Sequence, residues 1–151
     1  MKIIILFIVS VLSVISCQQS SAIPFEEVKN YFFRNDAAIP DDPVIDSSEQ
    51  FGELFGAAAF MGKDGQPTTI DFDREFVIAV VNPTTDCYTE LVPESLNKVQ
   101  GELVFTYNET IGDKQSWTMQ PVLLIKVDRK YKTESIQLSR RLQVLSPNTS
   151  D

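Results

Sequence analysis

The sequence predicts an α+β domain in which one principal helix packs on a mainly antiparallel sheet of about five to seven strands. Three observations lead to this prediction. An unbroken apolar run over residues 76–81 is typical of a strand buried on both faces. A segment that begins at Ser48 carries apolar residues at helical spacing. Much of the chain after residue 100 alternates between apolar and polar residues, as half-buried strands do.

The chain begins with a segment that has the features of a secretion signal. Lys2 supplies a positive charge, and residues 3–15 are apolar apart from two serines, which is too short for a membrane span of about 20 residues. The signal ends in Val-Ile-Ser-Cys, which resembles the lipobox of bacterial lipoproteins. In that family the cysteine receives a diacylglyceryl group and becomes the first mature residue, so the resemblance implies that residues 1–16 are removed and Cys17 is lipidated. The alternative is an ordinary signal peptide with a chance cysteine.

The resemblance also predicts a location. Several acyl chains, each contributing about 0.8 kcal/mol per buried CH₂, would anchor the protein stably to a membrane. Residues 17–24 are polar and end in a proline, which indicates a tether before a globular domain over residues 25–146 and a flexible tail over residues 147–151. Some Gram-negative lipoproteins carry an acidic export signal directly after the cysteine, and this chain does not. We therefore expect an outer-membrane protein that faces the periplasm.

Composition excludes several classes of function. Without residues 1–16, which include one lysine, the chain has 12 basic and 21 acidic residues, so its formal charge is 12 − 21 = −9. This negative charge and the lack of a basic run argue against nucleic acid as a partner. The sequence contains no histidine, which excludes Ser-His-Asp and Cys-His nucleophilic sites and His-ligated metals. We predict no catalytic residues, no metal, no cofactor and no enzymatic activity.

The two cysteines have different predicted roles. Once Cys17 carries lipid, Cys87 is the only thiol left, so an internal disulfide cannot form. Because no histidine is present to activate it, we expect Cys87 to be a small buried hydrophobic residue.

The first part of the domain is predicted from short patterns. Residues 25–34 fit either a helix face or a strand, and we predict a helical turn over residues 24–27 followed by a strand over residues 28–33. Two prolines and two aspartates make residues 37–43 a loop. Asp41 and Asp42 could start a calcium site, but no Asp-x-Asp-x-Asp-Gly spacing follows, so a solvated turn is the preferred interpretation.

The principal helix is predicted over residues 48–60. Ser47 is a suitable N-cap residue and Gln50 stands at the capping-box position. We expect Gly52 and Gly56 to let the helix approach the sheet closely. The apolar face is formed by Phe51, Leu54, Phe55 and Ala58.

The remaining strands are read from alternation and breaks. Asp71 and Asp73 could bind a metal, although they more simply mark the charged start of the buried strand. A second strand is expected over residues 88–92 and ends before Pro93. We predict that residues 102–107 and 115–127 form a hairpin about a turn at residues 108–113, and that residues 134–145 form the last strand. In that strand Ile136, Leu138, Leu142 and Val144 share one side, with Arg140 as the exception.

The connection between the first two strands is the candidate binding loop. Pro83 fixes its own φ, while Thr84, Thr85 and Asp86 can bond back to nearby backbone, and such a preformed loop loses little entropy when it docks. The alternative is a connection whose polar residues only satisfy their own backbone. The candidate residues are Asn82, Pro83, Thr84, Thr85, Asp86 and Tyr88.

Two family resemblances follow from these motifs. The order of motifs over residues 44–130 is similar to the C-terminal domain of PrcB-type proteins, which are lipoprotein accessories of bacterial protease complexes. The matching residues are Asp71-Phe72, 76–80, Tyr88 and 121–127, whereas the glycines of that family's turn are missing beside Tyr88. The segment Asn-Pro-Thr-Thr over residues 82–85 is similar to one loop of chagasin-type inhibitors, whose other two loops are missing.

These resemblances imply a noncatalytic protein-binding or protease-accessory module in the cell envelope, with an envelope protease or another protein as its partner. The alternatives are a direct protease inhibitor that uses the loop over residues 82–88 and a carboxylate-based hydrolase of the envelope.

Overall fold

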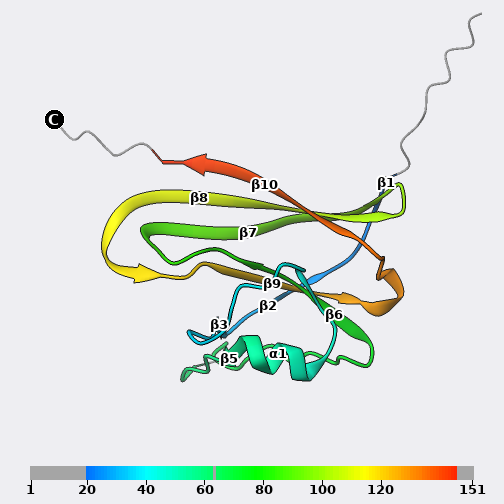
Figure 1. Ribbon diagram of the computed structural model, residues 1–151, viewed down its shortest axis with the longest axis horizontal. Helices are drawn as coiled ribbons and strands as arrows, with labels where there is room; N and C mark the ends of the chain where they lie inside the picture. Colours follow the sequence, from blue (N-terminus) through cyan, green and yellow to red (C-terminus); the bar gives the residue numbers. More distant parts are fainter. Residues whose placement is uncertain (1–19, 63, 146–151) are drawn as a thin grey trace, which may run out of the picture.

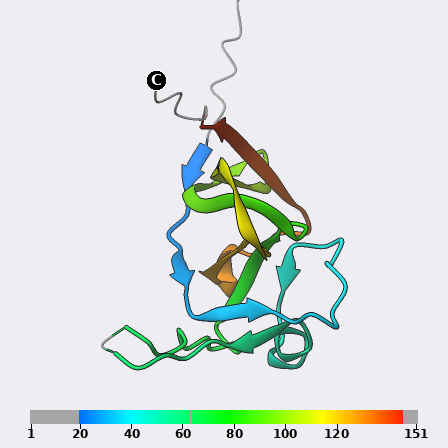
Figure 2. The same cartoon turned by 90° about the vertical axis from the view of Figure 1, so that its left-hand side faces the viewer.

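The computed structural model describes residues 20–62 and 64–145, which form three layers (Figures 1 and 2). The first sheet has the order β1-β7-β8-β10 and the second has the order β2-β9-β6-β4, while the pair β3-β5 and helix α1 make the third layer. The predicted mainly antiparallel α+β architecture is confirmed in part for the described residues. Their single α-helix is a minor element of seven residues, and they contain ten strands in three sheets rather than about five to seven in one. The predicted signal peptide, Cys17 and the tail over residues 147–151 lie outside the described residues.

The bounds of the elements are as follows. The first sheet contains β1 (Ser20–Ala22), β7 (Thr85–Val99), β8 (Glu102–Met119) and β10 (Ile136–Val144). The second contains β2 (Glu26–Val28), β4 (Val44–Ile45), β6 (Glu75–Val81) and β9 (Val122–Asp128). The third layer contains β3 (Tyr31–Phe33), α1 (Ser48–Leu54) and β5 (Phe55–Ala57), and a 3-10 turn, η1 (Arg129–Tyr131), follows β9.

Strand β6 is buried on both faces, as its unbroken apolar run predicts. Phe76 and Ile78 pack between the first and second sheets, whereas Val77 and Ala79 pack against the third layer. Because both faces of the second sheet are covered, its central strand has no solvent side and needs no polar alternation. The two clusters on either side of this sheet are the hydrophobic cores of the domain.

The predicted hairpin over residues 102–107 and 115–127 is wrong. Residues 108–113 do not turn but continue β8, which pairs with β7 through the two-residue turn Gln100-Gly101. The φ angles of these residues, 52° and 92°, fit the left-handed turn that the twist of a two-residue hairpin prefers. The predicted 115–127 strand is divided at Gln120-Pro121, and its second part is β9, in the other sheet.

Strand β7 does not stop before Pro93, as the sequence suggested. The strand extends from Thr85 to Val99, and a shift in register between Pro93 and Ser95 accommodates the proline. A bulge leaves a residue out of the ladder, so the missing N–H of proline is tolerated there.

The cap of the principal helix is confirmed, but its length is not. The Gln50 N–H donates to Ser47 Oγ at 3.2 Å. Helix α1 ends at Leu54 rather than residue 60, because the chain turns into β5 and pairs with β3. Gly56 permits a close approach in β5, where a Cβ would lie 2.4 Å from Phe32 Cζ, whereas Gly52 faces open space and does not contact the sheet.

The start of the domain also differs from the prediction. Residues 24–27 form no helical turn, and β2 instead pairs with β9. The expected strand over residues 28–33 is interrupted at Asn30, whose φ of 65° sends β2 and β3 to different sheets. Residues 20–22 of the expected tether form β1 against β7, and Ile23 is buried in the core, so the described part of the expected tether belongs to the domain.

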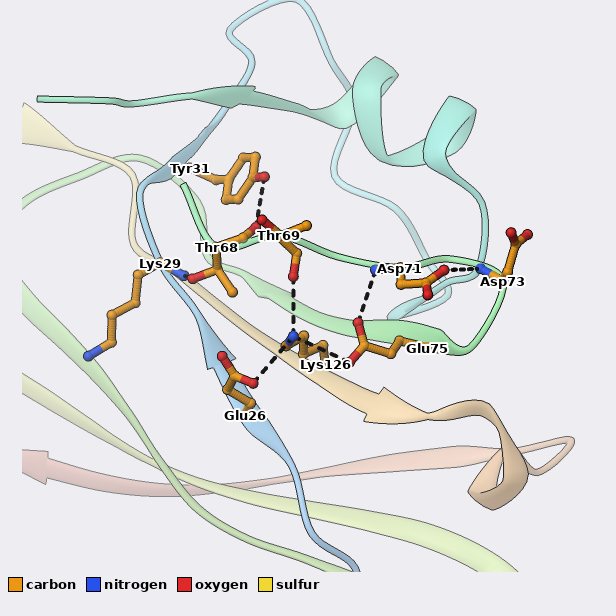
Figure 3. Close-up of polar contacts among 9 residues, drawn as sticks. All are labelled: Glu26, Lys29, Tyr31, Thr68, Thr69, Asp71, Asp73, Glu75 and Lys126. Carbon is orange, nitrogen blue, oxygen red and sulfur yellow. Dashed lines mark hydrogen bonds and ion pairs between the residues drawn. The ribbon is translucent and has the colours of Figure 1, made fainter. Parts of the chain in front are cut away.

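Lys126 on β9 fixes the outer side of the second sheet (Figure 3). Its Nζ lies 3.3 Å from Glu26 Oε2 and 3.3 Å from Glu75 Oε1, and it donates to the Thr69 carbonyl at 3.2 Å. Burial lowers the pKa of Lys126, but the hydrogen bonds to the two carboxylates outweigh this effect, so the pKa is raised. The largely buried ammonium of Lys126 thus connects β2, β6 and β9 with the segment before β6.

Candidate functional site

The candidate loop is shorter than the sequence suggested. Only residues 82–84 are irregular, because β7 begins at Thr85 and includes Asp86 and Tyr88. The Asn82 N–H donates to the Pro121 carbonyl at 3.0 Å, which places the loop beside the connection between β8 and β9. Thr85 Oγ1 accepts a hydrogen bond from the Cys87 N–H at 3.1 Å, as expected of a threonine that bonds back to its own backbone.

Asp86, the acidic residue among the candidate binding residues, forms an ion pair. Asp86 Oδ2 lies 2.7 Å from Lys114 Nζ on the neighbouring strand β8. The hydrogen bond from Lys114 lowers the pKa of Asp86 and, reciprocally, raises the pKa of Lys114. Because both side chains are exposed, the pair fixes local geometry more than it stabilises the fold.

The structure reveals a buried carboxylate, Glu109, that the sequence patterns did not predict as a site residue. Glu109 follows Leu103, Phe105 and Tyr107 along the inward face of β8, and it is buried. Its Oε1 accepts from Asn82 Nδ2 at 2.6 Å and its Oε2 accepts from Arg140 Nη1 at 3.0 Å. A buried charge needs such partners.

This network accounts for two features of the sequence. Arg140 interrupts the apolar row of β10 because it meets the carboxylate of Glu109, and Asn82 connects the same carboxylate to the candidate loop. The sequence does indicate the position of Glu109, because residues 103–109 alternate between apolar and polar and Glu109 falls at an inward position of this pattern.

A groove lies between the candidate loop and β10. One part of about 260 Å³ is lined by the loop, Glu109 and Arg140, and a second part of about 170 Å³ is lined by the loop before β4 and by Leu138. Asn82 lines both parts, so we treat them as one feature, the β10 groove. Its residues include Ile39, Pro40, Asn82, Pro83, Thr84, Thr85, Glu109, Ile111, Leu138 and Arg140.

Apolar side chains remain exposed along β10 beside this groove. The register places Leu138, Leu142 and Val144 opposite Phe105, Glu109 and Ile111 of β8, so they share its inward face. Leu142 and Val144 are nevertheless 52% and 65% exposed. Figure 1 shows β10 extending along β8, away from the second sheet.

The burial of the predicted site residues varies. Asn82, Pro83, Thr84 and Thr85 line the β10 groove, with Pro83 and Thr84 exposed. Tyr88 instead lines a separate cleft of about 570 Å³, together with side chains of β3. Cys87, which we expected to be buried, is only partly buried. The structure therefore brings together the first four candidate residues and separates them from Tyr88.

The aspartates considered as metal ligands take part in turns. Asp42 Oδ1 accepts from the Val44 N–H at 2.9 Å. Asp71 Oδ1 accepts from the Asp73 N–H at 3.1 Å, and the Asp71 N–H donates to Glu75 Oε2 (Figure 3). These bonds organise the chain just before β4 and β6.

Tyr107, which is largely buried, also lines the part of the β10 groove near Leu138. Burial and the negative charge of Glu109 raise the pKa of Tyr107, and Arg140 offsets part of this effect. The phenol is therefore neutral near pH 7. The groove thus offers a neutral hydroxyl, a carboxylate held by an arginine and an amide, and exposed apolar surface.

No protein-family model, no curated protein and no solved structure matches this chain. The likeness to PrcB-type proteins and to the chagasin loop therefore stays a prediction from sequence motifs. No helix in residues 20–62 and 64–145 is long and apolar enough to cross a membrane.

Proposed function

We propose that this protein is a lipid-anchored, noncatalytic protein-binding module of a bacterial cell envelope, which faces the periplasm from the outer membrane and binds its partner at the β10 groove. The observation that carries the proposal is the exposure of Leu142 and Val144 beside a groove with a fixed polar network. Exposed apolar side chains that lie together and are bordered by polar groups are characteristic of protein-interaction sites.

Preorganisation supports binding at this groove. Glu109 is bonded to both Asn82 and Arg140, so it joins the candidate loop to β10. A groove held by such bonds loses little conformational entropy when a partner docks. The same contacts support a noncatalytic role for Glu109, because its carboxylate is engaged by an arginine and an amide.

The position of the groove suits an anchored protein. Cys17 precedes Ser20 by three positions (20 − 17), so a lipid on Cys17 would lie within about 10 Å of β1. Ser20 pairs with Val99 at one end of β7, and the candidate loop precedes Thr85 at the other end. These ends are 14 positions apart (99 − 85), or roughly 45 Å along an extended strand (Figure 1). The groove would remain accessible while the lipid is in the membrane.

A photo-crosslinking experiment tests the binding site. We would place a benzophenone amino acid at position 142 of the full chain in bacterial cells and compare it with the same label at position 53, an exposed position of α1 in the third layer. We expect discrete protein adducts from position 142 and not from position 53. The same adducts from both positions, or none from position 142, would contradict the proposal, and an adduct to an envelope protease would support the accessory role.

The anchor has its own test. Cys17→Ser removes the thiol that would carry the lipid, so we expect complete loss of palmitate labelling and release from the membrane fraction. The control is Cys87→Ser, which should retain both. Continued labelling of the Cys17 variant would remove the lipoprotein assignment without affecting the proposed groove.

Direct inhibition of a protease is the second candidate function, because Pro83 and Thr84 are exposed at the tip of the loop. It predicts that the purified protein inhibits a papain-like cysteine protease and that replacing both residues by glycine abolishes the inhibition. The protein-binding proposal expects no inhibition in this assay.

A further inference from the structure

We infer that the partner binds by strand addition, as an extended segment with alternating apolar residues and with acidic residues near its centre, which pairs with the open edge of β10. This inference rests on the proposed protein-binding function and names the mode of binding and the chemistry of the partner.

Strand β10 is a long and regular edge. It is the last strand in the order of the first sheet, and its nine residues pair in parallel with β8 without a shift in register. Strand β7, whose edge is covered by β1 only over residues 97–99, has three register shifts and contains Pro93. Bulges, prolines and inward-pointing charges protect exposed edges. Within the described residues β10 has no bulge and no proline, and Arg140 is its inward-pointing charge.

Two hydrogen bonds show which backbone groups of β10 are available. The Ser135 carbonyl accepts from the Leu103 N–H, and the Leu145 N–H donates to the Ile111 carbonyl. In a parallel ladder alternate residues direct both backbone groups to the same neighbour. The odd-numbered residues therefore bond β8, and the even-numbered residues from 136 to 144 direct their N–H and C=O groups to the open edge.

The same even-numbered residues carry the exposed apolar row. Leu138, Leu142 and Val144 lie on the inward face of the sheet beside the β10 groove. An added strand would bond to the backbone of these residues and place every second side chain against their apolar surface. In strand addition, main-chain hydrogen bonds commonly provide affinity and side-chain pockets provide specificity.

Charge indicates the chemistry of the partner. Residues 135–145 contain two arginines and no acidic residue, although the whole chain has a formal charge of −8. The side chains of Arg140 and Arg141 are 55% and 66% exposed, and each has one carboxylate partner, Glu109 and Glu94. Their side chains remain more than half exposed, so their N–H groups can donate hydrogen bonds to further carboxylates of an added strand.

The same charges disfavour a second copy of the chain as the partner. Arg140 is the central residue of β10, so an antiparallel two-fold pairing centred on the strand would place Arg140 opposite itself. Like charges directly opposite each other destabilise a strand pair. We therefore assign the edge to a different chain with acidic residues.

Fluorescence anisotropy with two synthetic peptides tests the charge requirement. Both peptides have nine residues of alternating valine and threonine, with two adjacent central positions replaced by glutamate in one peptide and by lysine in the other. The full lipidated chain in detergent micelles is the titrant. We expect the glutamate peptide to bind about tenfold more tightly than the lysine peptide at low salt.

Two variants at one position test the backbone requirement. Leu142→Ala and Leu142→Pro both remove the leucine side chain, but only proline removes an N–H that faces the open edge. We expect the proline variant to bind the glutamate peptide about tenfold more weakly than the alanine variant. Circular dichroism melting verifies that both variants fold. If the proline variant does not fold, amide hydrogen exchange of the wild type decides: the glutamate peptide should protect the amides of Leu138 and Leu142 and leave Ser139 and Arg141 unchanged.

The outcomes separate this inference from the proposed function. Equal affinity for the two peptides, equal weakening by alanine and proline, or no selective amide protection would overturn strand addition. A concentration-dependent dimer that Leu142→Pro dissociates would replace the acidic partner with a second copy. If strand addition fails while the crosslinks from position 142 remain, the groove still binds protein by another mode. If the crosslinks are also lost, the proposed function fails too.

Discussion

Strands β6 and β10 contain similar apolar residues but lie in different environments. Ile78 of β6 is 0% exposed at the centre of the second sheet, whereas Leu142 of β10 is half exposed at the edge of the first. The second sheet is covered on both sides, whereas Leu142 and Val144 on the inward face of β10 stay exposed. An apolar row in a sequence therefore identifies surface that is to be covered, and the tertiary structure decides whether the chain itself covers it.

The largest expected effect is a difference in stability between these two strands. Ile78→Ala should lower the free energy of unfolding by about 2–5 kcal/mol, because it leaves a cavity in a fully packed core. Leu142→Ala should change it by less than about 0.5 kcal/mol, as is usual at an exposed site. Urea denaturation of both variants measures the comparison. Similar losses for the two variants would mean that β10 belongs to the core and is not an exposed edge.

The next effect tests how β10 is attached to the candidate loop. Arg140→Ala leaves the buried carboxylate of Glu109 with Asn82 as its remaining side-chain partner, so we expect a loss of about 1–3 kcal/mol in the same denaturation experiment. Arg141→Ala is the matched control, because it removes the neighbouring arginine from a more exposed pair with Glu94 and should have little effect. Equal effects of the two substitutions would argue against a structural role for the network.

The smallest effect concerns Lys126, which connects strands of the second sheet to the segment before β6. The folded-state pKa of Lys126 is raised, so its stabilising contribution is complete below its ordinary pKa and is lost as the pH rises through the folded-state value. We expect Lys126→Met to be less stable than the wild type at pH 8, and the difference to shrink above about pH 10.5. Thermal melts of both proteins across this range measure it. Lys29→Met, which alters the more exposed Lys29–Glu27 pair, is the control, and a difference that grows with pH would contradict the assignment.

Parts of the site were visible in the sequence and parts were not. Four of the candidate residues, from Asn82 to Thr85, do line one groove. The sequence predicts this connection between β6 and β7 because a proline and two threonines favour a defined loop in any surroundings. Glu109 and Arg140 were not selected, since they are 31 positions apart and only the parallel pairing of β10 with β8 brings them together. Tyr88 lines a separate cleft, since it lies within β7, which begins at Thr85.

The sequence by itself determined the features that depend on near neighbours. An unbroken apolar run specifies β6, and the Ser47 hydroxyl specifies the start of α1, because each depends on side chains within a few positions. Only the tertiary structure decided the uninterrupted course of β8 and the open edge of β10. Both features depend on which strands lie beside them. Strand pairing joins residues that are far apart in the chain, so the local sequence of one strand does not specify its partner.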